Sequence, residues 1–141
     1  MKGALLITMS SEEIVSDAPE SDKTVLIVDD DRDIGEMLKQ VITEQTNYRV
    51  LWIAESDLVL HAAAHLRPSL ILLDYMMPTM DGLKLYDHLQ QTGNMRGVPV
   101  VLISARATLP FEALRERGIY ILRKPFELSD LLDLVAQLVS K

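Results

Sequence analysis

Short, uninterrupted runs of aliphatic residues recur along the chain, and several of them end on a polar residue. Val25 to Val28 is followed by three aspartates, and Leu70 to Leu73 is followed by Asp74. Apolar runs of this length, bounded by turn residues, are typical of strands buried on both faces of a parallel sheet. The same reasoning predicts further strands at Tyr48 to Ile53, Val98 to Ile103 and Ile119 to Leu122.

Between these strands, apolar residues return every three or four positions, which predicts amphipathic helices. The first helix carries Ile34, Met37, Leu38, Val41 and Ile42 on one face, with Asp31 or Asp33 available as its N-cap. Further helices are expected over Ser56 to about Leu66, Leu83 to about Gln91, Phe111 to Arg117 and Leu128 to about Val139. Five alternating strand and helix units predict an α/β fold, a doubly wound five-stranded parallel sheet with helices on both faces.

Composition sets the limits of this architecture. A chain of 141 residues with 48% hydrophobic content predicts one core of ordinary size and a single domain over residues 24–141. Residues 10–22 are rich in serine and acid and lack a basic residue, so we expect residues 1–23 to be a disordered leader. The net charge of −7 argues against direct binding to nucleic acid. No apolar run reaches membrane-spanning length, and we expect a cytoplasmic protein.

The polar residues that follow the strands form a set suited to phosphate chemistry. They are Asp29 and Asp30, Asp74, Ser104 and Lys124, and the carboxyl ends of parallel strands meet at one edge of a sheet. Three carboxylates gathered there repel one another unless a cation compensates, and Mg²⁺ favours a few such oxygens beside a phosphate. Lys124 suits phosphoryl oxygens, and Ser104 adds a hydroxyl.

Each of these residues also has an ordinary structural interpretation. Asp74 alone could open a turn, Asp29 and Asp30 could favour a helix start, and Ser104 and Lys124 could be a loop cap and a solvated side chain. All five residues occur together at the strand ends, and this combination favours the phosphate site over the separate structural interpretations. His61 and His65 have the spacing of a helical metal pair, but the glutamate of the zinc-protease motif is missing, so we expect no metal there.

Four stretches in this order resemble the receiver domain of two-component response regulators: Val25-Leu26-Ile27-Val28-Asp29-Asp30-Asp31, Leu70 to Gly82, Val100-Val101-Leu102-Ile103-Ser104-Ala105 and Lys124-Pro125-Phe126. The resemblance implies the flavodoxin-like strand order 2-1-3-4-5. It also implies that Asp74 is phosphorylated from a phosphohistidine, and that Mg²⁺ is held by Asp29, Asp30, Asp74 and the backbone carbonyl of Met76. The roles of Asp29 and Asp30 stay interchangeable. Ser104 would bond the phosphoryl group, and Lys124, before a cis Pro125, would pair with it.

The implied partners are a sensor histidine kinase or histidine phosphotransfer protein and a downstream protein, with homodimerisation left open. The chain would be no enzyme in the usual sense, since it would catalyse only its own aspartyl phosphorylation and dephosphorylation. Two alternatives stay open. One is a magnesium-dependent phosphatase of the haloacid-dehalogenase type, although Asp29 and Asp31 are not followed by its motif. The other is a receiver that docks without being phosphorylated.

One position departs from the family pattern. Receivers commonly carry an aromatic residue three positions before the lysine, where this chain has Ile121. Tyr120 should point to the opposite face of its strand and cannot replace that ring. The segment from Ser104 to Lys124 also leaves room for only a short fourth helix. Both features fall on the face that the family most often uses for dimerisation and output.

Overall fold

A computed structural model describes residues 22–140 of the chain. Five strands form one parallel sheet: β1 (Thr24–Val28), β2 (Arg49–Ile53), β3 (Leu70–Asp74), β4 (Val100–Ser104) and β5 (Tyr120–Arg123). Their order in the sheet is β2-β1-β3-β4-β5, which confirms the predicted doubly wound topology. Of the predicted leader, only Asp22 and Lys23 lie within the described residues.

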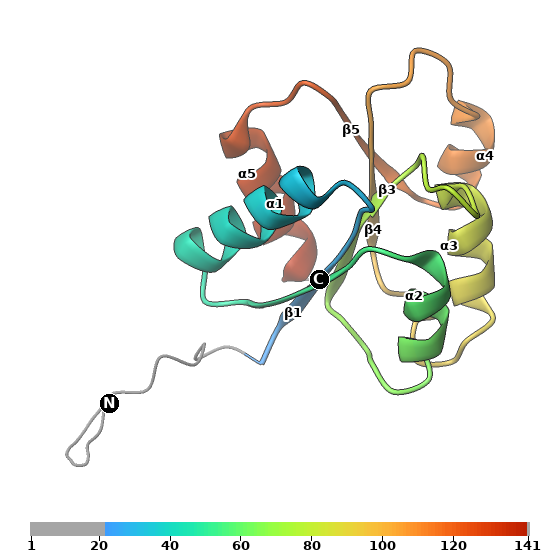
Figure 1. Cartoon of the computed structure of the whole chain (residues 1–141), viewed down its shortest axis with the longest axis horizontal. Coiled ribbons are helices and arrows are strands. Elements are labelled where there is room, and N and C mark those ends of the chain that lie inside the picture. The colour runs from blue at the N-terminus through green and yellow to red at the C-terminus, as the bar shows by residue number, and fades with distance from the viewer. Residues whose placement is uncertain (1–21, 141) are drawn as a thin grey trace.

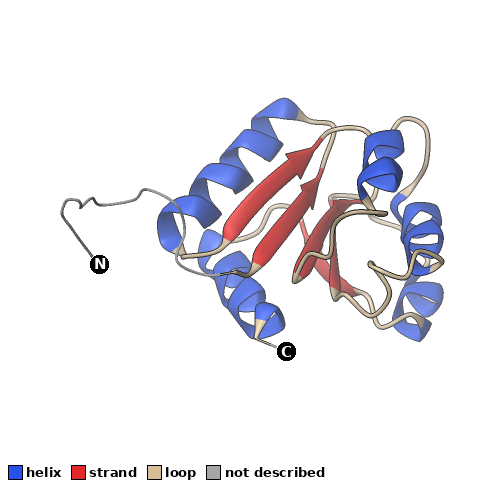
Figure 2. Cartoon of the chain, turned by 90° about the horizontal axis from the view of Figure 1, so that it is seen from below, coloured by secondary structure: helices blue, strands red, loops and turns tan. Residues whose placement is uncertain are grey.

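Five helices connect the strands: α1 (Arg32–Gln45), α2 (Ser56–Ala62), α3 (Gly82–Gln90), α4 (Phe111–Glu116) and α5 (Leu128–Val139). Helices α1 and α5 cover one face of the sheet, and α2, α3 and α4 cover the other (Figures 1 and 2). None of the helices within residues 22–140 combines the length and apolar character needed to cross a membrane.

The N-terminus of α1 explains how the chain leaves β1. Of the two candidate caps, Asp31 is the one used, because its carboxylate accepts hydrogen bonds from the backbone N–H groups of Asp33 at 3.0 Å and Ile34 at 3.2 Å. Leu38 and Ile42 are buried one helical turn apart against the sheet. Asp29 and Asp30 are therefore left at the strand end, outside the helix.

Helix α2 is shorter than the predicted Ser56 to Leu66. It ends at Ala62, and the following residues form a turn in which the N–H of His65 donates to the carbonyl of Ala62 at 2.9 Å. Pro68 disfavours helical backbone at the residue before it, so the chain must leave the helix in this region. His61 lies in the last turn of α2 while His65 lies beyond its end.

The sheet separates two apolar clusters. Strands β1, β3 and β4 are buried along almost their whole length, as the uninterrupted aliphatic runs predicted. On β5, Ile121 packs against the cluster below α2, α3 and α4, while Tyr120 packs against the cluster below α1 and α5. This confirms that Tyr120 and Ile121 point to opposite faces. Helix α4 has only six residues, in line with the short segment predicted there.

Candidate functional site

Three carboxylates converge at the carboxyl edge of the sheet. Asp29 follows β1, Asp30 comes next, and Asp74 ends β3, the central strand. Val28 and Leu73 are register partners in neighbouring parallel strands, so the residues after them emerge side by side. Carboxylate oxygens of Asp29, Asp30 and Asp74 all lie within 4.8 Å of one another. The structure thus brings together residues that are up to 45 positions apart.

Burial makes this arrangement electrostatically costly. Asp29 is 2% exposed and Asp74 is 8% exposed, whereas Asp30 is open to solvent. The pKa of Asp74 is raised to about 6, mainly by loss of hydration and next by the charge of Asp29, while Lys124 and the Met76 backbone N–H act in the opposite direction. A cation placed beside Asp74 would therefore stabilise its ionised form.

The pKa of Asp29 is also raised, again mainly by burial. A hydrogen bond from the backbone N–H of Asp31 to the Asp29 carboxylate, 2.9 Å long, opposes the shift, as does the charge of Lys124. Asp29 therefore receives one backbone donor of its own.

Ser104 and Lys124 border the acidic cluster on the β4 and β5 side. Ser104 is 1% exposed, and its hydroxyl oxygen accepts a hydrogen bond from the Arg106 backbone N–H at 3.0 Å. The backbone N–H of Lys124 donates to the Ser104 carbonyl at 2.9 Å, which ties the ends of the two strands together. The peptide bond between Lys124 and Pro125 is cis, as expected. Within residues 22–140, Lys124 makes no ion pair shorter than 4.0 Å, so its charge acts on the cluster from a longer distance.

The loop after β3 folds back closely over the strand end. The N–H of Gly82 donates to the Tyr75 carbonyl at 2.8 Å. A β-carbon at position 82 would lie 2.8 Å from Cδ1 of Leu102, a side-chain end that would have to move, and 3.1 Å from the backbone Cα of Tyr75, which is tighter than most real contacts. Glycine lets α3 begin this near to the site without displacing either group. Met76, whose carbonyl the resemblance assigned to the metal, lies in this loop with its side chain 56% exposed.

Arg106 was missed by the sequence reasoning. Its guanidinium carbon lies 5.6 Å from the centre of the Tyr75 ring, and its Nη1 lies 3.6 Å from the sulfur of Met76. The side chain therefore bridges the loop after β4 and the loop after β3 at the margin of the acidic cluster. Its position two residues after the strand-ending Ser104 was the only available signal.

Trp52 was also missed. Its indole Nε1–H donates to the backbone carbonyl of Asp29 at 2.8 Å, although the two residues are 23 positions apart and Asp29 lies just after β1 while Trp52 lies on β2. The bond links the edge strand β2 to one of the clustered aspartates. Trp52 is the chain's one tryptophan, which is the only feature of the sequence that could have drawn attention to it.

The donor set suits a hard divalent cation. Carboxylate oxygens in a partly solvated, strongly acidic corner are what Mg²⁺ accepts, and the charge of Lys124 only partly offsets the burial and repulsion that raise the pKa of Asp74. Within residues 22–140, these three aspartates are the only cluster of three or more His, Cys, Asp or Glu side chains whose ligand atoms lie close enough to share a metal. His61 and His65 are not part of this cluster.

Comparison with known proteins agrees with this geometry. The model of the response regulator receiver domain family matches residues 25–136. The response regulator MprA of Mycobacterium sp. strain KMS is 33% identical over 110 residues, which are 77% of this chain and 46% of the relative. The chain thus spans less than half the length of this curated relative.

Solved structures show the same fold. A CheY-like response regulator receiver domain protein from Methanospirillum hungatei JF-1 is 25% identical with a TM-score of 0.77, covering 85% of this chain and 95% of its own. The receiver domain of the sensor histidine kinase PA1611 from Pseudomonas aeruginosa PAO1 is 23% identical with a TM-score of 0.72, covering 86% and 100%. That structure has a magnesium ion coordinated in its active site cleft.

Proposed function

The chain belongs to the response regulator receiver domains, the signalling modules that two-component systems phosphorylate, and on this premise we propose that Asp74 is its phosphoacceptor. The observation that carries the proposal is the position of Asp74. It ends the central strand, within 4.8 Å of two further carboxylates, on the edge where Ser104 and Lys124 also emerge. In open α/β sheets this edge is where ligands bind.

The reaction is a transfer of one phosphoryl group. A carboxylate oxygen of Asp74 attacks the phosphorus of a phosphohistidine, the new P–O bond forms as the P–N bond breaks, and the imidazole nitrogen keeps the electron pair. Later, water attacks the phosphorus of the aspartyl phosphate and releases inorganic phosphate, which restores the carboxylate. Positioning and charge neutralisation carry most of the catalysis in such reactions.

The neighbouring side chains divide these tasks. We assign the charge of Lys124 to one phosphoryl oxygen and the hydroxyl of Ser104 to another. Asp29 and Asp30, with Asp74 and the Met76 carbonyl, are the proposed ligands of Mg²⁺. When bound, this ion supplies positive charge to the phosphoryl oxygens. The magnesium reported for the Pseudomonas aeruginosa receiver domain supports this assignment for a related fold.

The proposed partners follow from the chemistry. The donor is a phosphohistidine on a sensor histidine kinase or a histidine phosphotransfer protein, and the acceptor module then changes its contacts with a downstream protein. The family assignment sets aside a phosphatase of the haloacid-dehalogenase type. A receiver that docks without phosphorylation is the remaining alternative, and it predicts no labelling of Asp74.

Intact-mass analysis after incubation with acetyl phosphate tests the proposal. With Mg²⁺, the wild-type chain should gain the mass of one phosphoryl group, and with excess EDTA it should not. Asp74→Asn keeps the size of the side chain and removes the nucleophile, so it should stay unlabelled. Asp133→Asn removes one carboxylate from an exposed position of α5 and should label normally. Efficient labelling of the Asp74→Asn variant at the same site would show that another residue is the acceptor.

A further inference from the structure

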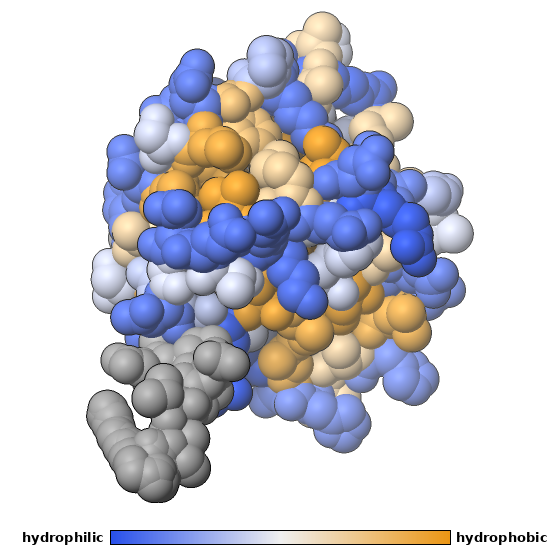
Figure 3. Space-filling view, turned by 60° about the vertical axis from the view of Figure 1, so that its left-hand side comes forward, coloured by the Kyte–Doolittle hydropathy of each residue, from blue (hydrophilic) through white to orange (hydrophobic). Residues whose placement is uncertain are grey.

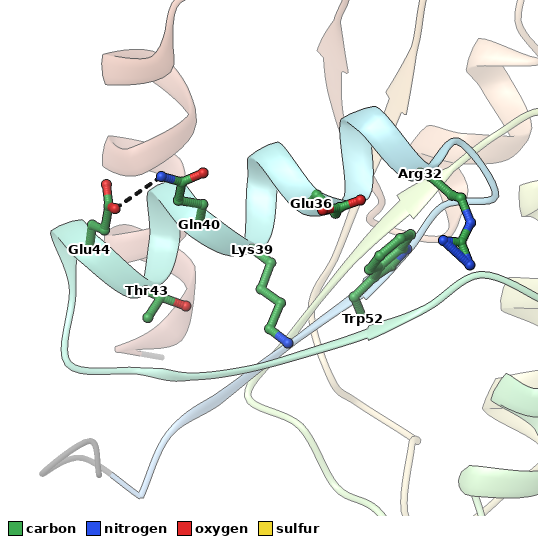
Figure 4. Close-up of a pocket in the computed structure, with 7 residues that line it drawn as sticks. All are labelled: Arg32, Glu36, Lys39, Gln40, Thr43, Glu44 and Trp52. Carbon is green, nitrogen blue, oxygen red and sulfur yellow. Dashed lines mark hydrogen bonds between the residues drawn. The ribbon is translucent and has the colours of Figure 1, made fainter. Parts of the chain in front are cut away.

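Trp52 lies on the edge strand of the sheet, yet its side chain is tied to the inner strand. Strand β2 is the outermost strand next to β1, and the indole lies alongside α1 between Arg32 and Lys39 (Figure 4). Helix α1 makes room for this ring. A β-carbon at Gly35, in the first half of the helix, would overlap the indole. The chain therefore places a helix-weakening glycine opposite a tryptophan, and the two form a matched pair.

The indole N–H is directed at one defined acceptor. It donates to the carbonyl oxygen of Asp29 at 2.8 Å, and this oxygen belongs to the peptide group that joins Asp29 to Asp30. Asp29 is 2% exposed, so water has little access to replace the bond. A buried carbonyl without a donor is costly, and Trp52 is the side chain that satisfies it.

Three hydrogen bonds together hold Asp29. Its N–H donates to the carbonyl of Ile53 at 3.2 Å, its carboxylate accepts from the N–H of Asp31 at 2.9 Å, and its carbonyl accepts from Trp52. The first two bonds involve only backbone donors that any sequence could supply here. The bond from Trp52 is the one whose donor is a side chain, and its acceptor belongs to the peptide plane between Asp29 and Asp30. The rotation of this plane affects the relative direction of the two adjacent carboxylates.

The surroundings of the indole argue against a purely space-filling role. Trp52 is only half-buried, and it lines a groove of about 620 Å³ together with Arg32, Glu36, Lys39, Gln40, Thr43 and Glu44. Hydrophilic side chains cross this side of the molecule between two apolar areas (Figure 3). Because the Trp52 side chain still faces an open, largely charged groove, complete burial of the ring does not explain why a tryptophan lies here. Its polar N–H is the part that makes a specific contact.

We propose that Trp52 is a positioning residue for the metal site, which it serves by orienting the peptide group between Asp29 and Asp30. The inference rests on the proposed function, because it assumes that these aspartates hold Mg²⁺. Partners that orient metal ligands from outside the coordination shell typically change metal affinity by roughly 10- to 100-fold. Since Trp52 acts on the backbone of its ligands, we expect a loss at the lower end of this range.

The first test compares Mg²⁺ dissociation constants by isothermal titration calorimetry. Trp52→Phe keeps a ring beside Gly35 and removes the N–H, and it should bind Mg²⁺ roughly tenfold more weakly than the wild type. Val50→Ala is the matched control, because Val50 lies on the same strand and faces the same apolar cluster but has no bond to Asp29. It should lose stability while keeping the wild-type affinity. Uniform replacement of the single tryptophan by 5-fluorotryptophan, which retains the N–H, should also keep that affinity.

A second measurement uses the wild-type chain alone. The single indole N–H should give one resonance in a ¹H–¹⁵N spectrum, and this resonance should shift during a Mg²⁺ titration with the calorimetric dissociation constant. In the Asp30→Ala variant, which lacks a proposed ligand but keeps Trp52, the indole resonance should shift only at much higher Mg²⁺ concentrations. If Trp52→Phe does not fold, this titration decides the question.

The outcomes of these experiments distinguish a failure of the positioning role of Trp52 from a failure of the proposed function. If the wild type binds Mg²⁺ but Trp52→Phe binds it equally well, or if the indole resonance stays unmoved at saturating Mg²⁺, the positioning role is wrong and the proposed function stands. If Val50→Ala loses as much affinity as Trp52→Phe, the effect is general destabilisation and the role is again wrong. If the wild type binds no Mg²⁺, both the metal assignment and the positioning role fall.

Discussion

Replacing the buried carboxylate of Asp74 by an amide should stabilise the metal-free protein at neutral pH. The folded state holds Asp74 with a pKa of about 6 instead of the ordinary aspartate value of 3.8, mainly through burial. A raised carboxyl pKa means that the folded state favours the protonated form. The stabilising effect of protonated Asp74 is therefore complete below about pH 4 and is lost as the pH rises through about 6. Above that pH, the folded chain carries a buried charge that the unfolded chain exposes to water.

The size of this penalty follows from the two pKa values. They differ by roughly two pH units, and each unit corresponds to about 1.4 kcal/mol, so ionised Asp74 costs the fold about 3 kcal/mol. Asp74→Asn removes the charge and can keep the hydrogen bond from the Met76 N–H. We expect the variant to be more stable than the wild type by up to about 3 kcal/mol near pH 8 and by almost nothing near pH 4.

Urea denaturation in EDTA, followed by circular dichroism across this pH range, measures the difference. Asp133→Asn serves as the control for net charge, because its carboxylate lies at an exposed position of α5. It should show neither the stabilisation nor its pH dependence. Added Mg²⁺ should narrow the gap, because a ligand that binds only the folded state stabilises the wild type by mass action. A constant difference between Asp74→Asn and wild type over the whole pH range, or a less stable variant near pH 8, would refute the reasoning.

Two further predictions concern the metal and the response to phosphorylation. Asp30→Ala should raise the stability of the metal-free fold, because the charge of Asp30 raises the pKa of both buried aspartates, and it should reduce the stabilisation by Mg²⁺. Denaturant melts with and without Mg²⁺ measure the two effects. An unchanged midpoint without Mg²⁺ together with undiminished stabilisation by Mg²⁺ would contradict this prediction. With Mg²⁺ and beryllofluoride as the phosphoryl mimic, hydrogen exchange should change most in the loops after Asp74 and Ser104. Large protection changes across residues 111–122, or dimerisation through the face that these residues form, would show that Ile121 does not weaken the family's usual switch.

Local pattern was enough to predict the fold and the convergence of the site. Strands buried on both faces leave uninterrupted aliphatic runs, and parallel topology then sends every strand end to the same edge. Asp29, Asp30 and Asp74 could therefore be placed together without coordinates, and the structure confirms their proximity. The choice between Asp31 and Asp33 as the helix cap stayed open, because either side chain could reach a free N–H. Only the loop backbone decides which one does.

Contacts that depend on the course of the loops could not be predicted. Trp52 reaches a backbone carbonyl just beyond the end of β1, and a carbonyl acceptor cannot be recognised in the sequence. Arg106 lies over Tyr75 because two loops approach each other, which residue types alone do not indicate. The phosphoacceptor role of Asp74 and the metal contact of the Met76 carbonyl stay predictions, since both concern atoms that join the site only in the reaction.

The region around α4 gives a structural reason for a limited response at that face. Arg117 follows the six residues of α4, and its guanidinium binds both carboxylate oxygens of Asp87 on α3, at 2.8 and 3.0 Å. The hydroxyl of Tyr86 donates to the Arg117 carbonyl at 3.1 Å, so two neighbouring residues of α3 hold the end of α4. A phosphoryl group can shift a conformational equilibrium only through contacts that differ between its two states. Ile121, which stands in place of an aromatic ring on β5, has no polar group of its own that could exchange partners, so the Asp87–Arg117 pair would have to rearrange instead. In the loops after Asp74 and Ser104, the side chains of Met76 and Arg106 are exposed and contact each other, and Arg106 lies over the Tyr75 ring, so they can rearrange without breaking a salt bridge.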